Sequence, residues 1–455
     1  MAIINTRSPY FISISDASIS YATLDLEIFS GEKASTQSPE YSLKKNKLGD
    51  DTTITFEVAE LIRDFITADD LCKWVRYTVK AFNNADAELA QSTDTILALQ
   101  SYSYFEEGSA YDFSNKSLLM SNREIFVPTF GDYSIPFYTD NNATLSFLNK
   151  DGVQQRLVSL LSSTTTDGQI ASVELFPQLV TNVSFNDASD WEIQPTDVIE
   201  DGVLKCNGGT GGRNYLNFAP TTGNQYILEF EIKEYTSGVI AVFDGSGGNN
   251  ITGALDKVGK YSFTYIQSAT SNNKISFGTG LGFDGVLDNI SLKEVQQIST
   301  INVTDDNDIT NIAINESCEA KYTPYKVTFI NKFGALQDMY FFKKAVVQMN
   351  TKRETYQGTT ISNGSYSISD HTRRDFNITG VEKVTLSSGF VSEEYNEVFK
   401  QMMLSERVWV TDEDYNVLPI NLKTSNINYK TSLNDKLIEY SIEFEKSYNV
   451  INNIR

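Results

Sequence analysis

The sequence is poor in several kinds of residue, and each shortage argues against a class of function. Among 455 residues there is one histidine, His371. Zinc sites built on histidine and Ser-His-Asp triads therefore have almost nothing to be made from. The three cysteines, Cys72, Cys206 and Cys318, lie far apart and form no CxxC pair. Their odd number and spacing argue against a disulfide framework or a zinc site.

Positive charge and long apolar runs are also scarce. The chain has 37 Lys+Arg against 59 Asp+Glu, a formal charge of −22, whereas unspecific nucleic-acid binding needs clustered lysine and arginine. No apolar run reaches the roughly 18 residues of a membrane span. The N-terminus, MAIINTRSPYFISI, lacks the basic and then apolar regions of a secretory signal peptide. We expect a soluble chain, made and kept in a reducing cytoplasm, with no nucleic-acid partner and no membrane span.

Aromatic residues are plentiful, with 27 Phe and 24 Tyr, and such residues fit the half-buried surface of a β-sheet. Residues 24–29 alternate with period 2, which predicts a strand. The apolar residues of 58–66 shift to a period of 3.6, which predicts a short helix. Residues 391–404 predict the main helix, with Ser392 as its cap. The predicted fold is therefore mainly β, with β-sandwich platform domains and short helices.

The glycines are unevenly distributed. Residues 183–298 hold 16 of the chain's 27 glycines, between short alternating strands, a pattern typical of an antiparallel β-sandwich. A surface loop whose ends lie close together tolerates such an insertion. The predicted domains are an N-terminal β-rich platform domain, a second platform segment, an inserted module and a C-terminal platform domain with one main helix, at residues 1–105, 106–182, 183–298 and 299–455.

Candidate binding groups gather in the glycine-rich module. A sugar site needs aromatic rings that stack on pyranose faces and polar side chains that bind hydroxyl groups. The candidates are Trp191, Tyr215 and Phe218 for stacking, and Arg213 and Asn217 for hydrogen bonding. The alternative for each aromatic residue is a place in the sandwich core.

Other chemistry has weaker sequence support. Glu393-Glu394 and residues 412–414 are carboxylate pairs in polar stretches, where a solvated surface is the better interpretation than a catalytic acid of raised pKa. His371 lies in a polar stretch and suits a surface role or a contact with a neighbouring chain. Asp284 and Asp288, with Asn289, suit either a structural ion or hydrogen bonding at a strand end. No catalytic residue is predicted, and we expect no enzyme.

Five segments of the module together carry a resemblance to a known family. They read DWE at 190–192, DGVL at 201–204, TGNQYILEF at 222–230, VGKYSF at 258–263 and FDGVLDNISLKEV at 283–295. On these segments the module resembles the jelly-roll carbohydrate-binding modules of phage and bacterial surface proteins. The resemblance implies a structural calcium ion with Asp288 as its matching ligand, and no other cofactor.

The flanking regions carry a second resemblance. Its segments are RSPYFI at 7–12, VAELIRDF at 58–65, FINKFG at 329–334, LPI at 418–420 through YKT at 429–431, and NDKLIEYSIEF at 434–444. They resemble tail or baseplate proteins of phages that infect Bacteroidetes-type hosts, with distal tail proteins as the functional type. Such proteins form rings and often carry an inserted sugar-binding domain.

The two resemblances together imply a non-catalytic structural virion protein. It would form an oligomeric ring in a tail tip, baseplate or connector after assembly in the host cytoplasm. Its expected partners are further copies of itself, other tail or connector proteins and host-surface polysaccharide. The alternative is a bacterial surface glycan-binding protein, against which the missing signal peptide argues.

Overall fold

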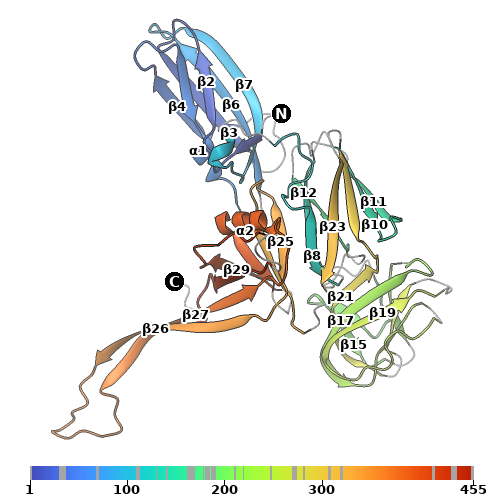
Figure 1. The fold of residues 1–455 in the computed structure, drawn as a ribbon. Helices are drawn as coiled ribbons and strands as arrows, with labels where there is room; N and C mark the ends of the chain where they lie inside the picture. Colours follow the sequence, from blue (N-terminus) through green and yellow to red (C-terminus); the bar gives the residue numbers. More distant parts are fainter. Residues whose placement is uncertain are drawn as a thin grey trace. The chain divides into compact units, whose positions relative to one another are not determined.

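The structure is a computed structural model that describes residues 3–29, 37–67, 71–108, 113–129, 131–139, 142–160, 170–177, 179, 185, 191–209, 212–218, 220–245, 248–268, 274–279, 282–305, 309–317, 321–411, 416–431 and 438–451. Within these residues there are thirty strands and two α-helices, so the predicted mainly β fold is confirmed (Figure 1). Asp190, Cys318 and residues 412–414 and 434–437, named above, lie outside the described residues.

The chain forms two compact units. Unit 1 contains Met1–Thr129, Ser134–Val173 and Ser299–Arg455, and unit 2 contains Phe130–Tyr133 and Glu174–Ile298. The inserted module predicted from the sequence begins at residue 183, within the long segment of unit 2. No helix among the described residues is long and apolar enough to cross a membrane.

The N-terminal part of unit 1 has a five-stranded sheet, β1-β7-β6-β3-β4, and a two-stranded sheet, β2-β5. Their buried side chains form one hydrophobic core, to which Ile62 of the short helix contributes, as its 3.6 period predicts. The elements are β1 (Ile3–Asn5), β2 (Phe11–Ser15), β3 (Tyr21–Phe29), β4 (Tyr41–Asn46), β5 (Thr53–Glu57), α1 (Ala59–Arg63), β6 (Cys72–Phe82) and β7 (Glu88–Leu99).

The middle part of unit 1 is a second five-stranded sheet, β11-β10-β22-β23-β8, beside the pair β12-β9. β8 and β23 pair in parallel, although Glu124 and its partner Ala313 lie on opposite sides of unit 2 in the sequence. The elements are the 3₁₀ helix η1 (Phe105–Glu107), β8 (Glu124–Pro128), β9 (Ser134–Tyr138), β10 (Ala143–Leu148), β11 (Gln154–Leu160), β12 (Ile170–Glu174), β22 (Thr300–Asp305) and β23 (Ile309–Ser317).

The C-terminal part is a seven-stranded sheet, β25-β24-β28-β29-β30-β27-β26, with α2 packed against it through Val398, Phe399 and Met402. The elements are β24 (Tyr325–Ile330), β25 (Leu336–Phe341), β26 (Val346–Gln357), β27 (Arg373–Ser387), α2 (Tyr395–Leu404), β28 (Val408–Thr411), β29 (Val417–Leu422) and β30 (Ser441–Lys446).

The start of the main helix corrects the sequence prediction. The helix begins at Tyr395, three residues after the expected cap Ser392, whose buried hydroxyl has no hydrogen-bond partner among the described residues. The Tyr395 amide instead donates to the Ser392 carbonyl in a preceding turn. Backbone turns therefore replace the side-chain cap that a serine there would otherwise provide.

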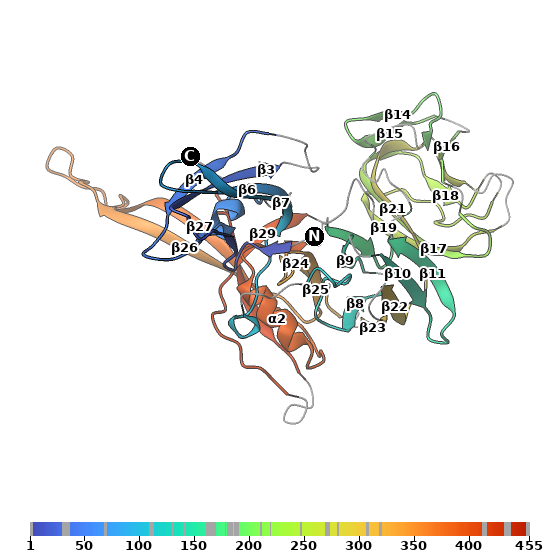
Figure 2. The same ribbon diagram turned by 90° about the horizontal axis from the view of Figure 1, so that it is seen from above.

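Unit 2 is a β-sandwich of two antiparallel sheets, β13-β16-β20-β18 and β14-β15-β21-β17-β19, whose labelled strands appear in Figure 2. The strands are β13 (Trp191–Glu192), β14 (Val198–Glu200), β15 (Val203–Asn207), β16 (Arg213–Leu216), β17 (Gln225–Ser237), β18 (Ala241–Phe243), β19 (Gly259–Ile266), β20 (Ile275–Gly278) and β21 (Asp284–Glu294). Alternate residues of β17, from Tyr226 to Ile232, enter the core, as their period of 2 predicts.

Candidate functional site

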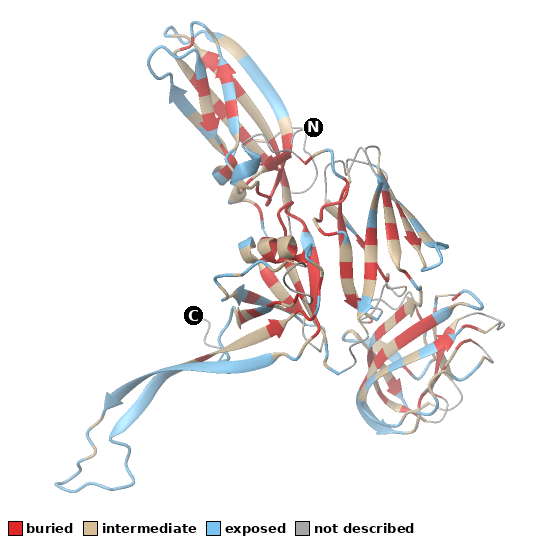
Figure 3. Ribbon diagram, viewed as in Figure 1, coloured by how far each residue is buried: buried red, intermediate tan, exposed pale blue. Residues whose placement is uncertain are grey.

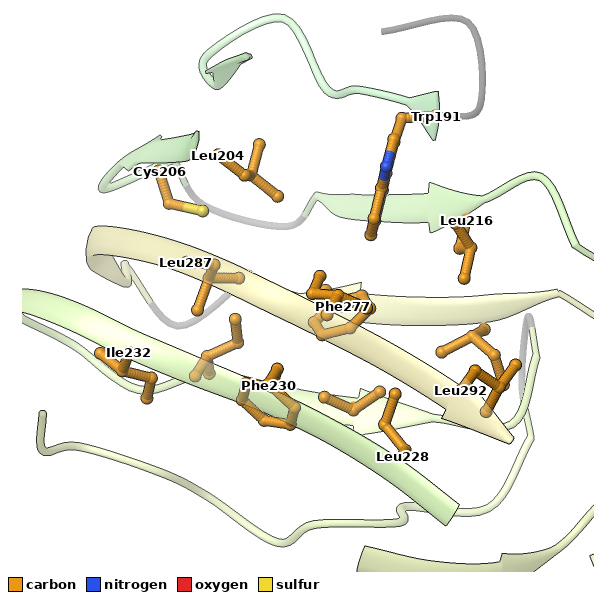
Figure 4. Close-up of a cluster of buried hydrophobic side chains, with 14 of the residues drawn as sticks. Trp191, Leu204, Cys206, Leu216, Leu228, Phe230, Ile232, Phe277, Leu287 and Leu292 are labelled. Atoms are coloured by element: carbon orange, nitrogen blue, oxygen red, sulfur yellow. The ribbon is translucent and has the colours of Figure 1, made fainter. Parts of the chain in front are cut away.

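Trp191, one of the predicted stacking residues, lies in the core of unit 2. Its side chain is 5% exposed, and its ring centroid is 5.0 Å from Phe185 and 5.6 Å from Phe277. Figure 4 shows the indole among the buried side chains of this cluster, which include Leu216 and Phe277. Trp191 therefore fills the sandwich, and its ring faces offer no stacking surface to a ligand.

Strand β16 presents two different faces because its residues alternate. Asn214 and Leu216 are buried, whereas Arg213 and Tyr215 are half-exposed. The buried Asn214 amide donates to Asp197 at 2.8 Å, and its oxygen accepts from the Gln194 backbone at 2.9 Å. This paired amide fixes the inward residues, so Arg213 and Tyr215 must point to the opposite face of the four-stranded sheet.

The strand register brings further side chains to that face. Tyr215 lies opposite Glu192 on β13 and opposite Ser276 on β20. Ser276 in turn lies opposite Phe243 on β18. Directly paired residues of an antiparallel sheet point to the same side. We call the set Arg213, Tyr215, Phe243 and Ser276 the outer face.

Arg213 is held in place on the outer face by its neighbours. Its guanidinium carbon lies 4.0 Å from the centre of the Phe243 ring, a cation–π contact. One guanidinium nitrogen donates to Ser276 Oγ at 3.1 Å and to the Gly245 carbonyl at 3.3 Å. The arginine has five N–H donors, so donors remain for a ligand after these bonds. The half-exposed Phe243 and Tyr215 rings flank this preoriented group.

A charged rim adjoins the outer face. Lys274 forms a salt bridge with Glu192, and its ammonium also donates to Asn217 Oδ1 at 3.0 Å. Asn217 is exposed and directly follows β16. These groups donate and accept hydrogen bonds beside the Tyr215 ring.

The structure thus brings together Arg213 and Tyr215, with Asn217 at the rim. Phe218 is half-buried and packs against the core of unit 2, the same core that contains Trp191. The sequence analysis missed Phe243, Ser276 and Lys274, because only the register of three separate strands places them beside Arg213. No local pattern in the sequence contains that information.

The outer face combines aromatic rings with hydrogen-bonding groups. Aromatic faces bind the apolar C–H side of a sugar ring, and planar donors with nearby acceptors bind its hydroxyl groups. Arg213 and the Lys274–Glu192 pair supply both kinds of hydrogen-bonding group beside the rings of Tyr215 and Phe243.

Asp288, the predicted calcium ligand, is bound by a lysine. Its carboxylate is nearly buried on β21, and Lys233 Nζ lies 2.5 Å from Oδ2. The hydrogen bond that Lys233 donates to Asp288 raises the pKa of Lys233. The other carboxylate oxygen, Oδ1, is buried without a hydrogen-bond partner among the described residues. Among the described residues no group of three or more acidic, Cys or His side chains is placed to hold a metal ion. In the structure Asp288 is thus paired with Lys233, and calcium binding at Asp288 stays a prediction.

Glu316 and the Glu393-Glu394 pair are acidic groups of unit 1 that were considered as candidates for acid catalysis or lie in a cavity. Glu316 lies in a cavity of about 200 Å³ with Phe126, Phe342 and Phe390, and burial raises its pKa. No second carboxylate lines that cavity among the described residues. Glu394 accepts a hydrogen bond from the Arg123 amide at 2.8 Å, and it is exposed together with Glu393.

Comparisons with known proteins give little. No family model and no curated protein matches the chain. Among solved structures, SGBP-B of the Bacteroides ovatus mixed-linkage glucan utilization locus, in complex with a mixed-linkage heptasaccharide, matches 63% of this chain and 72% of its own at 9% identity and a TM-score of 0.14. An alpha-2-macroglobulin of E. coli matches 94% and 37% of the two chains at 7% identity and a TM-score of 0.11. At such TM-scores neither similarity bears on fold or function.

Proposed function

We propose that this chain is a non-catalytic structural protein of a phage tail tip, baseplate or connector, whose unit 2 binds host-surface glycan. The assembly role rests on the resemblance of the flanking segments to distal tail proteins. The glycan role rests on one observation: Arg213 is fixed against Phe243 beside the half-exposed ring of Tyr215.

The physical argument for glycan is that the outer face is already organised. A ligand that binds a preoriented arginine and rigid aromatic rings loses less side-chain entropy than one that must order them. Sugars match the combination because each ring has an apolar face and a rim of hydroxyl groups. A bacterial surface glycan-binding protein would use the same face, and it would differ from a virion subunit in having no need to form a ring.

The test is a binding titration of the full chain with bacterial surface polysaccharides and their oligosaccharides. We expect Tyr215→Ala or Phe243→Ala to weaken binding about tenfold or more, equivalent to about 1.4 kcal/mol, because each removes a stacking surface. Arg213→Ala should weaken binding similarly through the lost donors.

The matched control is Tyr235→Ala, which removes a partly exposed tyrosine from β17 on the other sheet of unit 2. This variant should bind as the unchanged chain does. Equal losses from Tyr235→Ala and Tyr215→Ala, or binding that survives all three outer-face substitutions, would contradict the assignment of this face.

A further inference from the structure

The longest exposed element of unit 1 consists of strand β26, the connection to β27 and the outer end of β27, residues 346–378, which we call the arm. No residue of the arm is buried, and only Gly358 and Thr360 are half-buried. Figure 3 shows the exposed colour along both strands where they run on beyond the rest of their sheet. A two-stranded hairpin by itself is marginally stable in water, so an arm of this length calls for a covering partner.

The arm carries a concentration of exposed apolar side chains. Of 27 large hydrophobic residues exposed in the described parts of the chain, nine lie in these 33 residues. They are Val346, Val347, Met349, Tyr356, Ile361, Tyr366, Ile368, Phe376 and Ile378. A density this far above that of the remaining chain marks an interaction surface.

The outer strands of the arm are amphipathic. Glu354 lies opposite Phe376 and Tyr356 lies opposite Arg374, so the rings of Tyr356 and Phe376 share one face, together with Glu354 and Arg374. The Tyr356 and Phe376 ring centroids are 5.5 Å apart. The opposite face is polar, with Thr355 hydrogen-bonded to Asp375 at 2.8 Å. Alternation of this kind is typical of a sheet with one covered face, but no part of the described chain covers it.

The backbone of the arm is also free to pair. β26 is the edge strand of its sheet. β27 pairs with β30 only from Lys383 to Ser387, and the Val450 amide then donates to the Gly380 carbonyl at 2.8 Å. Within the described residues, the strand segments beyond that point bond only to each other, so both edges can accept another strand.

The charges of the arm and of the rest of the chain indicate which partner suits the arm. The arm contains four Lys and Arg against three Asp and Glu, a formal charge of +1. Since the whole chain carries −22, the rest of the chain carries −23. Arg353 is engaged with Asp375 at 3.1 Å, whereas Lys352 and Arg373 have no ion pair among the described residues. These two cations give the nearly neutral, apolar arm groups that can bind a strongly acidic surface, and another copy of this chain supplies one.

We propose that the arm docks on a second copy of this chain, covering the Tyr356–Phe376 face and pairing Lys352 and Arg373 with acidic groups of that copy. The inference rests on the assembly role proposed above and names the surface that carries it out. The exposed His371, two residues before the start of β27, would lie within this interface.

The test measures the mass of the full chain by light scattering over a range of concentrations. In the deletion variant, residues 353–378 are replaced by an Asn-Gly turn between Lys352 and Thr379, which already pair. We expect the unchanged chain to form oligomers and this variant to remain monomeric. The deleted residues contribute nothing to the core of unit 1, and unchanged circular dichroism would confirm that the variant folds.

A charge-matched pair of variants separates docking from general electrostatics. Lys352→Glu/Arg373→Glu/Arg374→Glu makes the arm acidic and should abolish oligomers. Lys47→Glu/Lys150→Glu/Lys257→Glu changes the net charge equally at exposed positions outside the arm and should leave them intact.

The possible outcomes distinguish the docking inference from the proposed assembly role. Oligomers that persist after deletion of the arm would overturn the docking inference and leave the assembly role standing. A chain that stays monomeric at every concentration would overturn both. A photo-crosslinker at Tyr366 should join two copies, and linkage only to another protein added from the same tail would assign the arm to that protein and reject self-docking.

Discussion

Two long antiparallel strand pairs in this chain have opposite surroundings. β17 and β21 in unit 2 are 13 and 11 residues long, and each buries several of its residues in the core of the sandwich. β26 and β27 in unit 1 are 12 and 15 residues long, yet every residue of β26 is exposed. The first pair has β15 and β19 on its two sides, whereas the second has a neighbour only along the inner part of β27.

The difference shows that an amphipathic strand does not reveal which chain will cover it. Phe230 and Phe376 are both phenylalanines in such a pair. The Phe230 ring packs against Phe277 at 5.6 Å, whereas the ring contact of Phe376 among the described residues is with Tyr356 of its own hairpin. Substitutions made in parallel in the two pairs measure how much a covering sheet is worth.

The largest expected effect is that of Phe230→Ala. Removing a fully buried phenylalanine costs about 3–5 kcal/mol of the free energy of unfolding, whereas Phe376→Ala at low concentration should cost less than about 0.5 kcal/mol. Urea unfolding followed by Trp191 fluorescence, with Trp74→Phe and Trp409→Phe as background, reports on unit 2. Backbone hydrogen exchange reports on the arm. Similar losses at the two positions would show that the arm is packed in the free chain.

A smaller effect is expected for glycine substitutions. A Cβ on Gly285 would lie 2.5 Å from the Glu234 carbonyl oxygen, because β17 and β21 approach closely there. Gly285→Ala should therefore destabilise unit 2 by about 1–3 kcal/mol. A Cβ on Gly380 would lie 2.6 Å from Met349 Cε, the end of a flexible side chain that can turn away.

Gly380→Ala is thus the matched control, and thermal unfolding should detect little change. A larger loss from Gly380→Ala than from Gly285→Ala would mean that Met349 is fixed in place, contrary to its exposure.

The smallest effects concern the cross-strand ion pair of each region. The pKa of Lys233 is raised, so its pair with Asp288 stabilises unit 2 below the usual lysine value of 10.5 and the stabilisation is lost as pH rises through the raised value. Lys233 is partly exposed and screened, so Lys233→Met should cost only about 1 kcal/mol. Thermal unfolding measured below pH 10.5 and at increasing pH above it should show this loss in the unchanged chain and no such pH dependence in Lys233→Met.

In the arm the sign reverses. The hydrogen bond from Thr355, and then that from Arg353, lowers the pKa of Asp375 below its usual 3.8. The ion pair of Asp375 with Arg353 therefore stabilises the arm above pH 3.8, and this stabilisation is lost as the pH falls through the lowered pKa of Asp375. Amide exchange in residues 351–357 should quicken there, and Asp375→Asn should abolish that step. A step that survives in Asp375→Asn would assign the effect to another carboxylate.

Sequence patterns predicted the parts of the fold that rest on local periodicity. The mainly β class, the strand at Leu24 and the helix around Ile62 follow from periods of 2 and 3.6. The predicted start of α2 was wrong, because turns at Ser392–Glu394 provide hydrogen bonds for the backbone amides without the serine side chain. No element was predicted over the arm, where polar residues and glycines interrupt the alternation.

The candidate site was only partly predictable. Arg213 and Tyr215 alternate with buried residues along one strand, so local pattern could place them on a surface. The ring of Phe243 reaches Arg213 only through the order of strands β16, β20 and β18, which depends on long-range pairing. Trp191 is a large apolar residue, and nothing in its neighbours distinguishes a core position from a stacking one.

The parallel pairing of β8 with β23 also constrains how the protein is made. Glu124 meets Ala313, a residue synthesised 189 positions later. At about 5–20 residues per second, the ribosome needs roughly 9 to 38 seconds to cover that interval. All residues of unit 2 are synthesised before β23, so the sandwich of unit 2 can fold while β8 is still unpaired along the edge that later binds β23. Slow codons or a chaperone acting on residues 124–128 during that delay would change the yield of folded chain and leave its final structure the same.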